Sequence, residues 1–251
     1  MNRQDVLKIK VEDYVAWISI NRPDHSNALS RDVFVSLREE LDRMAVDDNV
    51  RVVVITGEGK KAFCAGIDLK ERAAMPEHEI LPYRETVIRS FFHSLGNFPK
   101  PSVAAVNGVA YGGGAEVALA CDIRIASTTA RFSQSEIRWG MIPACGGCQR
   151  LRMIVGIGRA KELIFTGRVV DAEEAVRLGI FNRAVPPEEL EMETQKLAVE
   201  IAGHSPVAVR QAKKAIDVGA AVSEAYEYEF EVSKACYFAG DAMAGPGRFK
   251  R

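Results

Sequence analysis

Residues 102–126 read SVAAVNGVAYGGGAEVALACDIRIA, and this stretch predicts a strand, a glycine-rich turn, a helix and a second strand. Three consecutive glycines, Gly112 to Gly114, stand where the helix begins, so the backbone N–H groups there can approach a ligand closely. Glu116 places a carboxylate just inside the helix. A carboxylate next to unpaired N–H donors, which favour negative charge, suggests proton chemistry and therefore an enzyme.

The glycine run also has other interpretations. Taken alone, it favours a tight structural turn, with Glu116 an ordinary first-turn acid that the helix dipole stabilises. A phosphate-binding loop would require a Lys-Ser/Thr pair at its end or the G-x-G-x-x-G spacing. The sequence has neither at this position, and Glu116 would repel a phosphate. The surrounding sequence therefore has to separate the enzymatic interpretation from the structural one.

The composition is that of a soluble globular protein without a strong charge imbalance. Of the 251 residues, 47% are hydrophobic and 27% are charged, and the formal net charge is −1. Such a chain has no global field that would attract nucleic acid or an anionic membrane. No apolar stretch is long enough to span a bilayer, and the first residues lack the apolar segment of a signal peptide, so a cytoplasmic protein is expected.

The five cysteines also favour a reducing, cytoplasmic compartment, in which thiols stay free. Cys145 and Cys148 form a Cys-x-x-Cys pair, but no second cysteine pair and no closely spaced histidine pair could complete a zinc site. We therefore expect no metal centre. A redox role for the pair stays open, and pocket-lining thiols are the favoured interpretation.

The order of the predicted elements indicates an α/β fold with a parallel sheet. Strand, turn, helix and strand recur in residues 1–187, the predicted core, whereas residues 188–251 have only amphipathic helical patterns. This helical tail must bury its apolar face on the core or on another subunit. The individual expectations are a hairpin over residues 6–20, helices over 31–44, 83–95, 114–121 and 172–178, strands over 51–56, 102–107, 122–126 and 181–185, and helix caps at Ser30 and Asp171.

Several short motifs, spread in order over most of the chain, resemble those of the crotonase family, also called the enoyl-CoA hydratase/isomerase superfamily. Each motif is weak alone, whereas their order and spacing together are highly specific. The motifs are Asn21-Arg22-Pro23 with Asn27-Ala28-Leu29-Ser30; Phe63 to Lys70; Lys100 to Gly108; Tyr111 to Asp122; Phe132 to Glu136; Gly146 to Leu151; and Thr166-Gly167-Arg168.

This resemblance implies a spiral of ββα units followed by a C-terminal helical trimerisation region, and thus a homotrimer or a dimer of trimers. It implies an acyl-CoA thioester as the substrate, with no other cofactor and no metal. Two backbone N–H groups, those of Ile67 and Gly113 by motif position, would stabilise the enolate oxygen. The CoA would be held, partly through backbone contacts, by Ala65, Ile67, Asp68, Leu69, Lys70 and Gly113.

Two glutamates, Glu116 and Glu136, separate the activities of the family. By the resemblance, hydratases have carboxylates at both positions, whereas many isomerases keep only the one at Glu136. The pair therefore predicts an enoyl-CoA hydratase, which adds water in syn fashion across the 2,3 double bond, as in fatty-acid β-oxidation. Glu116 would activate the water at C3 and Glu136 would deliver a proton to C2. Because such a pair can titrate as a unit, this division of roles is provisional.

Other functions stay open beside the hydratase. An isomerase, a hydrolase or a C–C lyase acting on another acyl-CoA would keep the fold and change the chemistry. One branch of the family binds AU-rich RNA, and a nucleic-acid-binding protein is therefore a further alternative. The absence of a Lys/Arg stripe counts against that alternative.

Several positions depart from the usual family pattern and are expected to shape the acyl pocket. They are Ile67, Tyr111, Ser133, Trp139 and the segment Ala144 to Cys148. These departures suggest a branched, cyclic or otherwise unusual acyl group, and residues 64–75 and 160–165 look most like the methylglutaconyl-CoA hydratase branch. At the C-terminus, Phe249 and Lys250 either help to hold a neighbouring subunit's CoA or leave its adenine end more loosely held.

Overall fold

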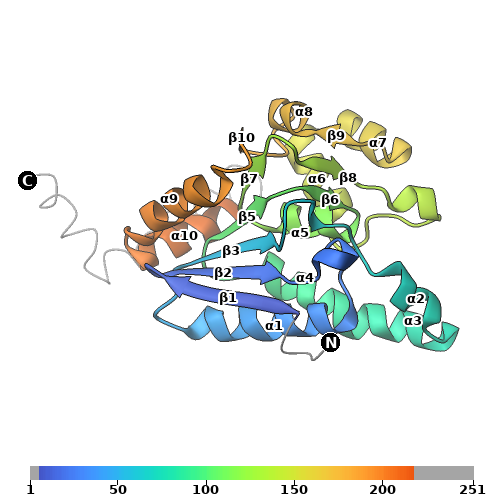
Figure 1. Ribbon diagram of the computed structural model, residues 1–251, viewed down its shortest axis with the longest axis horizontal. Helices are drawn as coiled ribbons and strands as arrows, with labels where there is room; N and C mark the ends of the chain where they lie inside the picture. Colours follow the sequence, from blue (N-terminus) through green and yellow to red (C-terminus); the bar gives the residue numbers. More distant parts are fainter. Residues whose placement is uncertain (1–5, 218–251) are drawn as a thin grey trace, which may run out of the picture.

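The computed structural model describes residues 6–217, which form two β-sheets surrounded by helices (Figure 1). The larger sheet has the strand order β1 (Leu7–Glu12), β2 (Val15–Ile20), β3 (Val52–Gly57), β5 (Ser102–Val106), β7 (Ile123–Ser127), β10 (Arg183–Val185). Strands β1 and β2 are antiparallel, and all other neighbours in this sheet are parallel. The predicted α/β class is thus confirmed.

A second, smaller sheet lies beside the first. Its strand order is β4 (Ala62–Cys64), β6 (Val109–Tyr111), β8 (Arg131–Ser133), β9 (Val170–Asp171). The first three strands are parallel, and β9 runs antiparallel to β8. Two of these strands, β6 and β8, lead directly into the segments that contain Glu116 and Glu136.

Helices connect the strands and cover the sheets. They are α1 (Arg31–Val46), α2 (Leu69–Ala74), α3 (Glu77–Tyr83), α4 (Arg89–Gly96), α5 (Gly113–Ala120), α6 (Gly147–Val155), α7 (Ile157–Thr166), α8 (Ala172–Arg177), α9 (Leu190–Ala202) and α10 (Pro206–Asp217), with short 3-10 helices η2 (Pro23–His25) and η4 (Glu136–Trp139) and a π-helical segment η3 (Arg84–Ile88). The two predicted caps are confirmed, because the Ser30 side chain accepts the N–H of Val33 and the Asp171 side chain accepts that of Glu174.

Different helices cover the two faces of the larger sheet (Figure 1). On β3, Val53 and Ile55 belong to the core that includes Phe34 of α1. Val52 and Val54 point to the opposite face, where α9 covers them. This alternation follows from the two-residue period of a strand, and it explains why a strand buried on both faces reads as a continuous apolar run.

The part of the predicted helical tail that the structure describes buries its apolar face on the chain's own core. Leu190, Ala198 and Ala202 of α9 pack in one cluster with side chains of the larger sheet. The division of the chain at residue 187 and the oligomerisation role of its tail stay predictions. The expectations for the region after residue 217, including those for Phe249 and Lys250, lie outside the described residues.

Two expectations about local structure need correction. The strand over 102–107 does not lead straight into the glycine run, because the short strand β6 comes between them. Gly108 allows this: an added Cβ there would collide with the Lys61 carbonyl oxygen, so the chain passes the smaller sheet at close range. The helix expected over 83–95 is composed of the end of α3, then η3 and α4. Among the helices of residues 6–217, none combines the length and the apolar character needed to cross a bilayer.

Candidate active site

Two backbone N–H groups from distant parts of the chain lie close together where α5 begins. Gly112 precedes this helix with φ 51° and ψ −124°, a conformation that glycine adopts without strain, and Gly113 is the first helical residue. Ile67 lies in the loop between β4 and α2. A Cβ atom added to Gly113 would be 3.5 Å from the Ile67 nitrogen. Neither amide has a hydrogen-bond acceptor within residues 6–217, so both are free to donate to a ligand.

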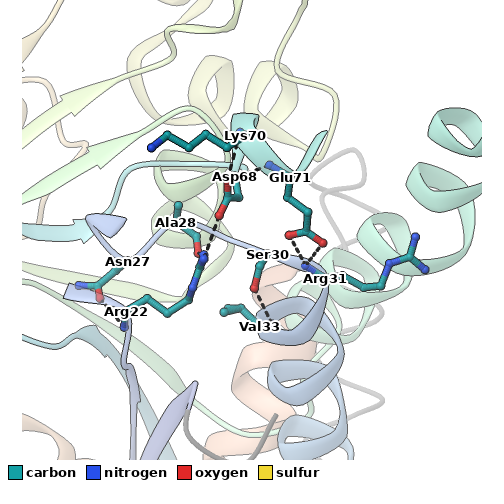
Figure 2. A network of polar contacts seen from close by, with 9 residues as sticks. All are labelled: Arg22, Asn27, Ala28, Ser30, Arg31, Val33, Asp68, Lys70 and Glu71. Carbon is teal, nitrogen blue, oxygen red and sulfur yellow. Dashed lines mark hydrogen bonds and ion pairs between the residues drawn. The ribbon is translucent and has the colours of Figure 1, made fainter. Parts of the chain in front are cut away.

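A partly buried ion pair fixes the loop that contains Ile67 (Figure 2). Arg22 Nη2 lies 2.9 Å from Asp68 Oδ2, and each side chain is 12% exposed. The same guanidinium donates from Nη1 to the carbonyl oxygen of Ala28, 2.6 Å away. Asp68 also caps α2, because its Oδ1 accepts two backbone N–H groups of the first turn. The Asp68 carboxylate therefore holds the Ile67 amide in position from the next residue.

Glu116 lies in the first turn of α5, and only 2% of its surface is exposed. Its Oε1 accepts two backbone N–H groups, that of Cys145 at 2.7 Å and that of Gly147 at 3.0 Å. Burial raises the pKa of the Glu116 carboxyl above its ordinary value, although both N–H groups favour the ionised form. A Cβ at Gly147 would lie 2.9 Å from Oε1, so only glycine leaves room for this contact.

Glu136 starts η4 and approaches the same helix end from the neighbouring segment. A Cβ added to Gly112 would lie 3.5 Å from Glu136 Oε1. The side-chain amide of Gln134, which is 1% exposed, faces this carboxylate; in the orientation that satisfies both ends of the amide, its nitrogen donates to Oε1 at 3.3 Å and to Oε2 at 3.2 Å. Burial, assisted by the charge of Glu116, raises the pKa of Glu136 to about 7. This carboxyl can therefore take up or release a proton near neutral pH.

Both carboxylates and both N–H groups face one cavity, which encloses about 780 Å³ when the open space at its mouth is included. Its walls come from the glycine turn, the Ile67 loop, the helical segments α2, α3 and η3, and the loop after η4. Most of the lining side chains are apolar or aromatic. They are Ile67, Leu69, Met75, Ile80, Tyr83, Ile88, Trp139, Met141 and Ile142. An apolar cavity with a few converging polar groups is typical of a small-molecule site.

The cavity combines two chemical capabilities. The N–H groups of Ile67 and Gly113 can stabilise negative charge that develops on an oxygen atom between them. The carboxyls of Glu116 and Glu136, both with raised pKa, can accept and deliver protons close to the same point. Together these groups suit a reaction in which a proton moves at a carbon atom next to a carbonyl group.

Comparison with known proteins agrees with this chemistry. A family model described as enoyl-CoA hydratase/isomerase matches residues 10–242. The chain belongs to the enoyl-CoA hydratase/isomerase family. Sequence motifs alone predicted this crotonase membership, and the prediction is confirmed.

Individual members of the enoyl-CoA hydratase/isomerase family are similar to the chain over most of its length. It is 40% identical over 237 residues to the short-chain-enoyl-CoA hydratase of Clostridium acetobutylicum, covering 93% of this chain and 90% of that protein. It is 39% identical over 227 residues to the mitochondrial methylglutaconyl-CoA hydratase of Mus musculus, covering 89% and 71%. The crystal structure of an enoyl-CoA hydratase from Bacillus anthracis matches with a TM-score of 0.94 at 39% identity, over 98% of this chain and 96% of that one. The predicted crotonase-like fold is confirmed by this likeness.

The structure brings together the residues that the sequence nominated as catalytic. These are Glu116, Glu136, Ile67 and Gly113, and all four line the cavity. Of the other positions nominated for CoA, Ala65 and Leu69 also line it, whereas Asp68 and Lys70 do not. Asp68 is engaged by Arg22, and the exposed side chain of Lys70 extends away from that ion pair (Figure 2).

Three parts of the site were not identified from the sequence. Gln134 was not assigned a contact with Glu136, although it lies within the same motif. Arg150 was not recognised as the residue that holds the Cys145 loop, to whose carbonyl oxygen its Nη1 donates at 3.0 Å. The helical residues from 72 to 88 were not assigned to the cavity at all. Their amphipathic pattern did not identify them as cavity-lining, because apolar side chains that face a cavity have the same spacing in the sequence as those that face a core.

The departures from the family pattern fall into two groups. Ile67, Trp139 and Cys145 line the cavity, whereas Tyr111 and Ser133 do not. Ser133 is instead structural, since its Oγ donates to the carbonyl oxygen of Gly167 at 2.9 Å.

The Cys145–Cys148 pair consists of partly buried thiols that stay protonated. Burial raises the pKa of both thiols, so neither has the thiolate character of a redox centre. Cys145 lines the cavity, as the favoured interpretation of the sequence has it, whereas Cys148 does not. Among residues 6–217, no three His, Cys, Asp or Glu side chains are arranged to hold a metal ion.

The raised pKa of Glu136 has a consequence for stability. Folding raises this pKa from 4.5 to about 7, so the folded state binds the proton more tightly. The resulting stabilisation is complete below pH 4.5 and is lost as the pH rises through 7. We therefore expect Glu136→Gln, which stays neutral, to have a higher Tm than the unaltered protein at pH 8.5 and an equal Tm at pH 4.5.

Thermal melts of both proteins across this pH range measure the difference. The matched control is Glu188→Gln, because Glu188 is an exposed acid outside the cavity. Its Tm difference from the unaltered protein should not change with pH. A Tm difference for Glu136→Gln that is the same at both ends of the range would show that the folded protein does not disfavour the ionised form of Glu136.

Proposed function

We propose that the protein is an enoyl-CoA hydratase, which adds water in syn fashion across the 2,3 double bond of a 2-enoyl-CoA thioester to give a 3-hydroxyacyl-CoA. The observation that carries this proposal is the convergence of two carboxyl groups with raised pKa, Glu116 and Glu136, on the cavity that also contains two free backbone N–H groups. Membership of the enoyl-CoA hydratase/isomerase family supports the substrate class.

In this proposal the N–H groups of Ile67 and Gly113 bind the thioester carbonyl oxygen. Addition of a nucleophile at C3 pushes electrons through C2 onto this oxygen and creates an enolate. Two preorganised donors in a mainly apolar cavity stabilise that charge more than they stabilise the neutral carbonyl, and so lower the barrier by several kcal/mol, about 2.7–4 kcal/mol for a single such donor.

The two glutamates divide the proton transfers. Glu116 takes a proton from the attacking water, since the N–H groups of Cys145 and Gly147 favour its ionised form. Glu136, with a pKa of about 7, carries a proton in an appreciable fraction of molecules at neutral pH and delivers it to C2. The enolate becomes the thioester again as C2 takes this proton, and transfer of the proton from Glu116 to Glu136 through solvent restores both carboxyls, so that only water has been added.

The CoA portion is held in the same proposal by the segment from Ala65 to Lys70. Ala65 and Leu69 line the cavity beside the Ile67 amide. Asp68 contributes through its backbone, because its carboxylate is occupied by Arg22 and by the first turn of α2. Lys70, the last residue of this segment, is exposed and can bind a charged phosphate of the CoA.

The test is a panel of linear, branched and cyclic trans-2-enoyl-CoA substrates. We expect at least one of them to lose the ultraviolet absorbance of its conjugated thioester, with the 3-hydroxyacyl-CoA identified by mass. If every conjugated substrate is left unchanged and a 3-enoyl-CoA is converted to its 2-enoyl isomer, the protein is an isomerase. No turnover of any enoyl-CoA would reject both activities.

We also propose that the protein needs no metal, acts in the cytoplasm and assembles as a homotrimer or a dimer of trimers. The two carboxyls and two N–H groups supply all the proton transfer and charge stabilisation that the reaction requires. Large apolar side chains on the described surface, such as those of Trp139, Met153 and Phe165, are between 64% and 74% exposed and would be covered by neighbouring subunits. Light scattering of the full chain tests the assembly, and chelator dialysis followed by the hydration assay tests the absence of a metal requirement.

A further inference from the structure

Arg84 places a positive charge in a cavity whose other walls are mainly apolar. It starts η3, the π-helical segment between α3 and α4, and Ile88 at the other end of that segment also lines the cavity. Short π-helical segments within α-helices are frequent at functional sites, because the inserted residue turns side chains out of the normal helical register. The proposed mechanism, which uses Glu116, Glu136 and two backbone amides, leaves Arg84 without a role.

The guanidinium of Arg84 has no hydrogen-bond acceptor and no ion-pair partner among residues 6–217. Its neighbour Arg150 differs, since that side chain donates to the carbonyl oxygen of Cys145. Arg84 is half-buried, so part of its hydration has been lost without a protein partner to replace it. A half-buried and unpaired guanidinium that faces a ligand cavity is a ready site for an anion, most favourably for a carboxylate bound to both arms of its planar fork.

The position of Arg84 relative to the reacting groups identifies which part of the ligand it meets. Its charge acts on Cys145, whose backbone N–H holds Glu116 Oε1. Ile88, Ala144, Cys145 and Arg84 also border a second hollow, whose lining includes Arg89 and Arg150. Arg84 therefore lies beyond Glu116, on the side of Cys145. A substrate whose C2 and C3 lie at the glutamates would direct the far end of its acyl chain towards this guanidinium.

We propose that Arg84 is a specificity-determining residue that binds an anionic group at the distal end of the acyl chain, so that the preferred substrate is an enoyl-CoA whose acyl chain ends in a carboxylate. This proposal rests on the proposed function of the same cavity.

A second guanidinium, Arg72 of α2, also lines the cavity, and its place argues for a different role. It lies on the helix that Asp68 caps, next to the segment proposed for CoA. The carboxylate site is therefore assigned to Arg84.

The experiment compares substrates that differ only at the end of the acyl chain. Hydration kinetics are measured with trans-2-pentenoyl-CoA against trans-glutaconyl-CoA and with trans-2-hexenoyl-CoA against trans-2-hexenedioyl-CoA, in which a carboxylate replaces the terminal methyl group. In at least one pair we expect kcat/KM to favour the carboxylate by about tenfold to a hundredfold, the range of one charge-assisted hydrogen-bonded pair. Arg84→Met should bring the ratio of the two kcat/KM values close to one. Arg84→Lys, which keeps the charge but lacks the paired N–H donors of a guanidinium, should give an intermediate ratio.

Arg89→Met is the matched control. It removes the same charge from the second hollow but not from the wall of the main cavity, so the carboxylate preference should persist. An unaltered protein that prefers the methyl-ended member of both pairs would overturn the proposal. So would an Arg84→Met protein that keeps the preference, or an Arg89→Met protein that loses it to the same extent.

A binding measurement separates this proposal from the proposed hydratase activity. Calorimetric titration with glutaryl-CoA and pentanoyl-CoA, which have no double bond to hydrate, reports the same end-group preference without catalysis. Absence of hydration together with tighter, Arg84-dependent binding of glutaryl-CoA would reject the hydratase and retain the carboxylate site. Hydration without such a preference in binding or kinetics would reject the carboxylate site and retain the hydratase.

Discussion

Replacing either Glu116 or Glu136 by glutamine is expected to lower kcat for hydration by about a hundredfold to ten-thousandfold, with a much smaller change in KM. Glutamine has nearly the same shape and can still accept a hydrogen bond, so the cavity and the bound substrate should change little. It cannot take or give the proton. The expected loss is therefore confined to the step in which protons move.

Steady-state kinetics with the best substrate of the enoyl-CoA panel measure this loss. Glu188→Gln, which changes an exposed acid outside the cavity, should leave kcat and KM unaltered. The Glu116→Gln/Glu136→Gln double variant should be little worse than the poorer single variant, because two groups that act on one water and one substrate fail together. If one of the single variants turns over at the unaltered rate, that glutamate has no part in the chemistry.

Gly113→Ala is expected to lower kcat/KM by about a hundredfold to a thousandfold while leaving the protein folded. The added Cβ would lie 3.4 Å from Ile67 Cγ1 and 3.5 Å from both the Ile67 nitrogen and Leu29 Cδ1, which are ordinary contact distances. The backbone of Gly113 has negative φ, so alanine fits without strain. The methyl group would nevertheless stand beside the Ile67 N–H, in the space that the carbonyl oxygen of the substrate needs.

Circular dichroism and thermal melts, measured together with the kinetics, distinguish this effect from unfolding. Gly114→Ala provides the contrast, since its Cβ would collide with the carbonyl oxygen of Cys64 and should prevent normal folding. The two variants should thus lose activity for different reasons: Gly113→Ala because the oxygen site is blocked, and Gly114→Ala because the protein does not fold normally. A Gly113→Ala protein that keeps full activity would show that no oxygen atom is bound between these two amides.

Much of the fold could be predicted from the sequence because local signals and tertiary packing agree. The helix after Ser30 has both a cap and an apolar stripe at spacings of three and four, and the structure has α1 there. The glycine run and Glu116 were likewise readable, since glycines at a helix start and a carboxylate in its first turn are local features. Strand β6 could not be recognised, because three residues are too few to show a period.

The unpredicted parts of the site depend on contacts between segments. The Gln134 amide meets the Glu136 carboxylate only because of the turn between them, and Arg150 reaches Cys145 only because α6 starts in that loop. Arg84 faces the cavity because a π-helical segment shifts the register of its helix, and a pattern analysis that assumes 3.6 residues per turn places such a side chain on the wrong face. These arrangements leave no periodic trace in the sequence.

The contacts that hold Glu116 make the position of its carboxylate largely independent of the shape of the acyl pocket. Its Oε1 accepts the backbone N–H groups of residues 145 and 147, and the Cys145 thiol also bonds to the carboxylate, whereas the side chain of Ala144 only lines the cavity. A change of side chain at residue 144 would reshape the space offered to the acyl group and leave the hydrogen bonds to the carboxylate in place, provided that Cys145 and Gly147 are kept. This loop is therefore a place where substrate range can be altered, by evolution or by a mutant library, with little damage to the reaction itself.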